Sequence, residues 1–123
     1  MENNAADLKN QPFKQKLQFA LQGLGYAFKQ ESNVRRHIFF GLTALILFAF
    51  VQPTAIWWAL IVLVICLIIA AEILNSSIEA MLDHLHPDIH PTVGCIKDML
   101  AAMVLLLSIA AGIIGVLALV DSI

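Results

Sequence analysis

The sequence predicts an all-α integral membrane protein, with an N-terminal amphipathic surface helix followed by three transmembrane helices. Of its 123 residues, 60% are hydrophobic and only 13% are charged, and the mean hydropathy is +0.85. These values lie outside the range of a soluble domain of this size. Long uncharged runs also alternate with short polar connections, as expected of a multi-pass chain. We expect a single membrane-embedded domain over residues 1–123.

The N-terminal segment is predicted to be a tail and a surface helix. Residues 1–11 are polar and offer no apolar face, so we expect a disordered tail there. Residues 12–30 are predicted to form an amphipathic helix in the membrane surface, although such a helix can also pack on protein. Phe19 and Tyr26 project away from its apolar stripe. These rings could stack on a flat ligand such as a nucleobase, or pack against a neighbouring element.

The transmembrane helices are predicted over residues 34–51, 54–84 and 92–120. The second begins with 18 uncharged residues, which rise about 27 Å, close to the thickness of a hydrocarbon core. Six of the seven basic residues precede Ile38, so the N-terminus is expected in the cytoplasm and the C-terminus outside. The first apolar run starts too far from Met1 to be a cleaved signal.

An acidic ribbon follows the uncharged part of the second span. At about 100° per residue, its polar side chains fall on one side of the helix. They are Glu72, Asn75, Ser76, Glu79 and Asp83. An ionisable residue at the end of a span is costly unless it faces protein, water or a cation, so we interpret the ribbon as functional. One three-span chain can scarcely shield it, which favours an oligomer.

The remaining polar groups lie at the same cytoplasmic depth. Carboxylates that hold Mg²⁺, a lysine and a helix N-terminus are together what metal-assisted phosphoryl transfer requires. No Gly-rich nucleotide-binding loop occurs in the sequence. The three histidines and Asp88 of residues 84–91 also admit a zinc site, but histidines of an interfacial loop are more often solvated.

At these residues the chain resembles the prokaryotic diacylglycerol kinase and undecaprenol kinase family, small integral-membrane lipid kinases. The most specific motifs are Glu72-Ile-Leu-Asn-Ser-Ser-Ile-Glu79-Ala and Lys97-Asp98-Met99. The resemblance implies a homotrimer with shared sites in the bacterial cytoplasmic (inner) membrane. It also implies that Mg²⁺ and ATP come from the cytoplasm and that the lipid comes from the bilayer. No nucleic acid partner is expected.

The resemblance also implies roles for individual residues. Glu72 would be the catalytic base, with Asn75 supporting the site, and Glu31 and Glu79 would bind the metal. The residues implied to bind ATP are Phe19, Glu31, Glu79, Asp88, His90, Lys97 and Asp98. Those expected to contact the lipid substrate are Asn33, Arg35, His37 and Glu72.

The lipid that is phosphorylated remains open at the level of sequence. Glu31-Ser-Asn33 with His37, and His90-Pro91, look like the undecaprenol branch, whereas the Glu72 and Lys97 motifs look like the diacylglycerol branch. We favour diacylglycerol, converted to phosphatidic acid, over undecaprenol, converted to undecaprenyl phosphate. Two other classes of function are a small proton-coupled exporter and a non-enzymatic interaction protein. An exporter would carry its glutamate near the midplane, and an interaction protein would leave the ribbon without a role.

Overall fold

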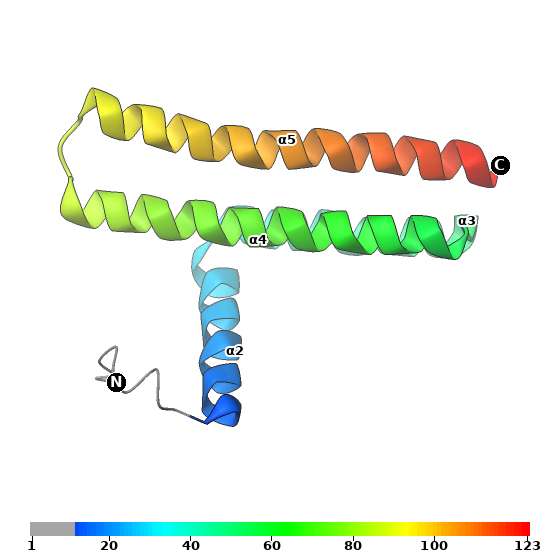
Figure 1. Cartoon of the computed structure of the whole chain (residues 1–123), viewed down its shortest axis with the longest axis horizontal. Coiled ribbons are helices and arrows are strands. Elements are labelled where there is room, and N and C mark those ends of the chain that lie inside the picture. The colour runs from blue at the N-terminus through cyan, green and yellow to red at the C-terminus, as the bar shows by residue number, and fades with distance from the viewer. Residues whose placement is uncertain (1–11) are drawn as a thin grey trace. The chain divides into compact units, whose positions relative to one another are not determined.

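The structure, a computed structural model, describes residues 12–123, and within them the chain consists of helices joined by short connections. The helices are α2 (Phe13–Gln30), α3 (Ser32–Val51), α4 (Ala55–Leu85) and α5 (Pro91–Ser122) (Figure 1). The predicted tail over residues 1–11 lies outside the described residues. The chain divides after Ser32 into two units, which are described separately below.

In the first unit, α2 begins directly after Pro12, whose carbonyl accepts the backbone N–H groups of Gln15 and Lys16. The helix ends at Glu31, where the backbone becomes extended and the N–H still donates to Ala27 O at 2.9 Å. The large apolar side chains of the predicted stripe are exposed: Phe13, Leu17, Leu21, Leu24 and Phe28. The predicted helix is thus present over residues 13–30. Its position in a membrane surface stays a prediction.

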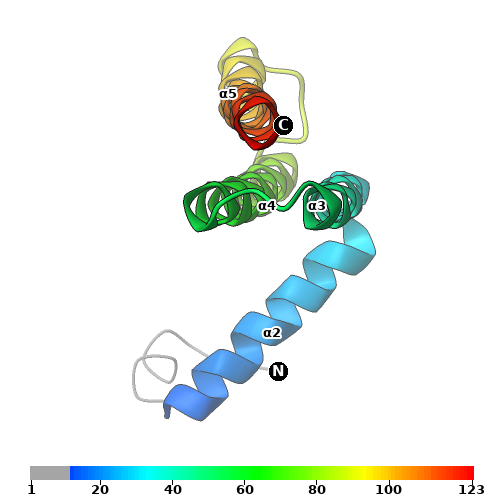
Figure 2. The ribbon, with the colours of Figure 1, turned by 90° about the vertical axis from the view of Figure 1, so that its right-hand side faces the viewer.

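The second unit confirms the three predicted spans, because α3, α4 and α5 are each long and apolar enough to cross a membrane. Their ends lie within two residues of the predicted ones. The helices run side by side, as the view along them shows (Figure 2). At one end, residues 52–54 join α3 to α4 through Gln52, which adopts a left-handed conformation with φ 55°.

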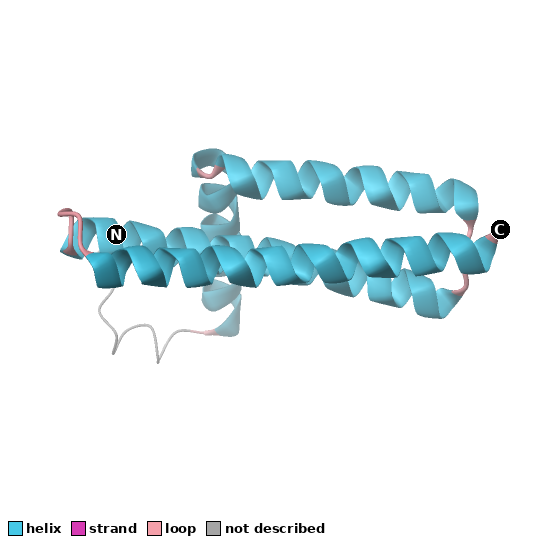
Figure 3. Cartoon of the chain, turned by 90° about the horizontal axis from the view of Figure 1, so that it is seen from above, coloured by secondary structure: helices cyan, strands magenta, loops and turns pink. Residues whose placement is uncertain are grey.

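The hairpin of α4 and α5 extends well beyond the start of α3 (Figures 1 and 3). Because α4 has 31 residues and α3 has 20, the last turns of α4 have no counterpart in α3. The predicted overshoot of the second span is thus present. It gives the acidic ribbon two different surroundings, one beside α3 and one beyond it.

The packed core lies at the other end of the unit, near the connection between α3 and α4. Phe48, Ile61 and Ala118 are buried there, one from each helix. Trp57 closes this end, because its indole Nε1–H donates to Asp121 Oδ2 of α5 at 2.8 Å. A tryptophan that packs its ring and satisfies its N–H fits a membrane interface.

Candidate active site

The acidic ribbon on α4 passes from a buried end to an exposed end. Glu72 is 5% exposed and Asn75 is 8% exposed, whereas Glu79 is half-buried and Asp83 is exposed. The gradient follows from the fold. The first turns of α3 cover α4 near Glu72, but α3 does not extend as far as Asp83. The two ends therefore offer different chemistry.

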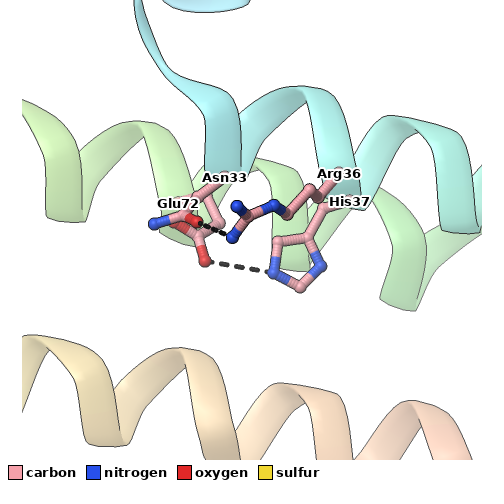
Figure 4. Close-up of polar contacts among 4 residues, drawn as sticks. All are labelled: Asn33, Arg36, His37 and Glu72. Atoms are coloured by element: carbon pink, nitrogen blue, oxygen red, sulfur yellow. Dashed lines mark hydrogen bonds and ion pairs between the residues drawn. The ribbon is translucent and has the colours of Figure 1, made fainter.

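At the buried end, Glu72 is paired with a histidine of α3. His37 Nε2 lies 3.1 Å from Glu72 Oε1, and the side chains are 25% and 6% exposed respectively. Figure 4 shows both side chains together with Arg36 and Asn33 of α3. Arg36 Nη1 donates to Asn33 Oδ1 at 3.2 Å. The sequence predicted His37 as a lipid contact, and its partner in the structure is the predicted catalytic base.

Two buried oxygens beside this pair lack a hydrogen-bond partner among the described residues. They are Glu72 Oε2 and Asn75 Oδ1, one helical turn apart on α4. Leaving a buried acceptor unsatisfied costs about 1–3 kcal/mol, so native proteins usually supply a donor. A substrate hydroxyl, a cation or a second copy of the chain would each satisfy these oxygens.

An apolar hollow of about 130 Å³ opens next to His37. All three long helices line it, and its residues are His37, Phe40, Gly41, Ala44, Ile65, Ile68 and Ala111. Glu72 itself does not line the hollow, but its contact His37 does, and Ile68 lies one turn before Glu72 on α4. From His37 the hollow extends towards the middle of the spans. The arrangement suits an amphiphile whose hydroxyl meets Glu72 and whose hydrocarbon chain follows α4.

The packing of the Ile65 side chain of α4 against α3 at this hollow depends on a glycine. A Cβ at Gly41 would lie 2.8 Å from Ile65 Cγ2, which is shorter than real contacts of this kind. The absent side chain therefore makes room for Ile65 of α4, one turn away from His37.

At the exposed end, α4 meets the beginning of α5. Lys97 Nζ donates to Asp83 Oδ1 at 2.6 Å, and Glu79 is near enough for its charge to act on Lys97. A hollow of about 190 Å³ lies beside this pair. Its polar lining comes from Asp83, His86, Asp88, His90 and Lys97. Three residues predicted to bind ATP, namely Asp88, His90 and Lys97, are thus brought together.

The same hollow lies at the N-terminus of α5. His90 caps this helix, because its Nδ1 accepts the backbone N–H of Thr92 at 3.1 Å, and Pro91 occupies the first helical position. A ring that accepts through Nδ1 carries its proton on Nε2 when it is neutral. His90 can therefore present an N–H donor to a ligand while Nδ1 holds the cap.

The remaining predicted site residues are Phe19, Glu31, Asn33, Arg35 and Asp98. Phe19 and Glu31 belong to the first unit. Asn33 and Arg35 are exposed on α3, and Asp98 is exposed on α5 without lining the 190 Å³ hollow. Sequence reasoning missed a role for Asp83, although it placed this residue on the ribbon four positions after Glu79.

Among the described residues, no group of three or more His, Cys, Asp or Glu is placed to hold a metal ion. The histidines of residues 84–90 therefore do not gather as the zinc alternative requires. Mg²⁺ needs less from a protein, because it is commonly held by one or two carboxylates together with substrate phosphates and water. The half-buried carboxylate of Glu79, close to Lys97, fits that more modest requirement.

The chain is similar to known proteins over most of its length. The family model described as prokaryotic diacylglycerol kinase matches residues 18–119. Proteins named diacylglycerol kinase are 34% identical over 98 residues in Synechocystis, 32% over 96 in Haemophilus influenzae and 32% over 93 in Escherichia coli K12. The matches cover 79%, 78% and 76% of this chain, and 56%, 81% and 76% of those relatives. The chain thus spans about half the length of the Synechocystis protein and most of the other two.

These similarities indicate that the chain is an enzyme. They favour neither the exporter nor the non-enzymatic interaction protein. The matched region contains the ribbon, both hollows, all of α3 and α4, and α5 except for its last three residues. The chain therefore belongs to the prokaryotic diacylglycerol kinase family, multi-pass membrane phosphotransferases with an alcohol group as acceptor.

Proposed function

We propose that the protein is an ATP-dependent lipid kinase, which transfers the γ-phosphate of Mg·ATP to the hydroxyl of a membrane lipid. Diacylglycerol is the favoured acceptor, giving phosphatidic acid, because the relatives described above carry that substrate in their names. The observation that carries the proposal is the buried, unpartnered oxygen of Glu72, whose contact His37 lines an apolar hollow. The site would face the cytoplasm in the bacterial inner membrane.

Glu72 would act as the general base. Its Oε2 takes the proton of the lipid hydroxyl while the hydroxyl oxygen forms a bond to the γ-phosphorus, and the bond from that phosphorus to ADP breaks. A buried carboxylate suits this task because water cannot compete for the proton or for the phosphoryl group. Asn75, one turn away, would hold the reacting groups through its unpartnered oxygen.

The exposed end of the ribbon would bind the nucleotide. Lys97 is held by a solvent-exposed carboxylate, Asp83. Such surface pairs are weak, so an arriving phosphate can replace Asp83 as the partner of the ammonium group. The N-terminus of α5 adds backbone N–H groups, which favour anions. Asp88, His90 and Asp98 would border the same nucleotide, as would Phe19 from the first unit.

Glu31 and Glu79 would hold Mg²⁺ together with phosphate oxygens of ATP. When bound, the ion neutralises charge on the phosphates during transfer. Carboxylate oxygens are the ligands that this hard cation prefers. The half-buried position of Glu79, between the buried and the exposed ends of the ribbon, agrees with this role.

The proposal includes a homotrimer with sites shared between subunits. Supporting it, only 6% of the apolar window of α5 is buried, compared with 28% for α4, so most of α5 is left for lipid or another subunit. Mixing inactive Glu72→Gln subunits with inactive Glu31→Gln subunits tests the shared site. Recovered activity is expected, whereas no recovery despite confirmed co-assembly would place each site within one subunit.

A second acceptor is undecaprenol, and one observation favours it. The hollow beside Glu72 is lined by apolar groups apart from His37. A polyprenol needs no polar contacts beyond its hydroxyl, whereas a glycerolipid has ester oxygens to satisfy. On this alternative the product is undecaprenyl phosphate, and the base, the metal and the nucleotide site are unchanged.

The test offers diacylglycerol and undecaprenol in parallel to purified protein in mixed micelles with Mg·ATP. We expect a specificity at least about tenfold higher for diacylglycerol, equivalent to about 1.4 kcal/mol of differential transition-state binding. A tenfold preference for undecaprenol would make that lipid the substrate. Phosphorylation of neither lipid would contradict the proposed activity.

A further inference from the structure

We propose that His37 is a positioning residue for Glu72. Its Nε2, 3.1 Å from Oε1, holds the carboxylate so that Oε2 is the oxygen that receives the proton of the lipid. This inference rests on the proposed kinase activity and goes beyond the role of His37 as a lipid contact. The observations behind it are the 3.1 Å contact and the unequal surroundings of the two oxygens of Glu72.

The carboxylate of Glu72 is asymmetric. Oε1 lies against the imidazole of His37, whereas Oε2 is buried and lacks a partner within the described part of the chain. A glutamate side chain has several rotatable bonds, so an oxygen that is held by a neighbour limits the orientations of the other oxygen. A base must lie within hydrogen-bond reach of the proton that it takes, and an error of 1 Å can cost about 100-fold in rate.

A histidine suits this position better than an arginine would. A guanidinium is always charged and would stabilise the carboxylate anion, which weakens it as a base. An imidazole can make the same contact without the permanent charge of a guanidinium. Arg36, the neighbouring cation, is bonded to Asn33 (Figure 4). Facing the same hollow, α4 contributes only Ile65 and Ile68 and α5 only Ala111, none of them charged.

The two possible roles of His37 differ in kinetics. A lipid contact would hold substrate and transition state alike, so its loss would raise KM for the lipid. A positioning residue acts on the chemical step, so its loss lowers kcat and leaves KM for the lipid nearly unchanged. The length of the replacing side chain also matters, because the amide nitrogen of glutamine can reach the place of Nε2 and that of asparagine cannot.

The experiment compares His37→Asn and His37→Gln with wild type, and uses His84→Asn, an exposed histidine near the end of α4, as the matched control. We expect His37→Asn to lower kcat by about 10- to 100-fold with KM for the lipid within about twofold. His37→Gln should recover most of that loss, and the control should behave as wild type. Equal losses for both His37 variants, or a raised KM with normal kcat, would overturn the proposal.

A double variant separates positioning from damage to the fold. Glu72→Asp draws the carboxylate back from His37, so the effect of His37→Asn should be several-fold smaller in that background than in wild type. An undiminished effect would show that His37 acts independently of Glu72 and would overturn the inference. If wild-type protein phosphorylates neither lipid, the proposed function itself fails and the inference fails with it.

Discussion

Two polar contacts made by carboxylates of α4 lie in opposite surroundings. His37 and Glu72 form a contact of 3.1 Å in which the carboxylate is 6% exposed, whereas Lys97 and Asp83 approach to 2.6 Å with side chains 35% and 66% exposed. The shorter pair is therefore the more solvated one. Solvated pairs exchange partners readily, and buried pairs keep their geometry. We therefore expect proton transfer at the buried end of the ribbon and ATP binding at the exposed end.

The largest effect is expected from Glu72→Gln. Glutamine keeps the shape of the side chain and can still contact His37, but it has no carboxylate oxygen to accept a proton. Turnover should fall by about 100- to 10,000-fold, the usual contribution of a general base. Lipid phosphorylation by purified protein measures this. A variant with near-normal turnover would remove Glu72 from the mechanism.

A smaller effect is expected from Glu79→Gln, midway along the ribbon. If Glu79 holds Mg²⁺, its loss should raise the Mg²⁺ concentration required for half-maximal rate and weaken ATP binding in parallel. Titrating Mg²⁺ at several ATP concentrations measures both. An unchanged metal dependence would mean that this carboxylate is only charge on a protruding helix.

Gly41→Ala should affect stability first. The new methyl group would sit 2.8 Å from Ile65 Cγ2, a methyl group on the branched Cβ. Because a β-branched side chain has little freedom at χ1 in a helix, the backbone of α3 or α4 must shift. Overpacking of this kind typically costs about 1–3 kcal/mol. Thermal unfolding in detergent measures the loss, with Gly25→Ala as control because nothing lies within 4 Å of its added Cβ. Equal stability of the two variants would contradict the tight packing of Ile65 against Gly41.

The smallest effect on stability is expected from Asp83→Asn. Its partner is a solvated lysine, and exposed pairs contribute little to folding. The thermal midpoint should stay within about 2 °C of wild type. A loss as large as that of Gly41→Ala would show that the exposed pair holds the α4–α5 hairpin together, against the comparison drawn above.

The sequence predicted the helices well because their signals are local. A run of 18 uncharged residues, flanked by polar turns, is sufficient to place a span. The ribbon was also predictable, since Glu72, Asn75 and Glu79 share a face by helical periodicity alone. Periodicity likewise predicted the start and end of α2, although its place in the membrane surface remains untested.

The partners of the ribbon were not predictable in the same way. The contact of His37 with Glu72 depends on the register between α3 and α4, which the close approach at Gly41 helps to set. The contact of Lys97 with Asp83 depends on how residues 86–90 turn α5 back along α4. Registers between helices arise from packing over many residues, so no local pattern reports them.

Steady-state kinetics test most directly whether Glu72 acts in the chemical step and Lys97 in ATP binding. Glu72→Gln and Lys97→Met are purified in parallel, and kcat and KM for ATP are measured for each with the same lipid. The account expects Glu72→Gln to lose kcat with KM for ATP within about twofold, and Lys97→Met to raise KM for ATP by about tenfold or more. The reverse assignment, with Glu72→Gln weakening ATP and Lys97→Met affecting only kcat, would contradict it.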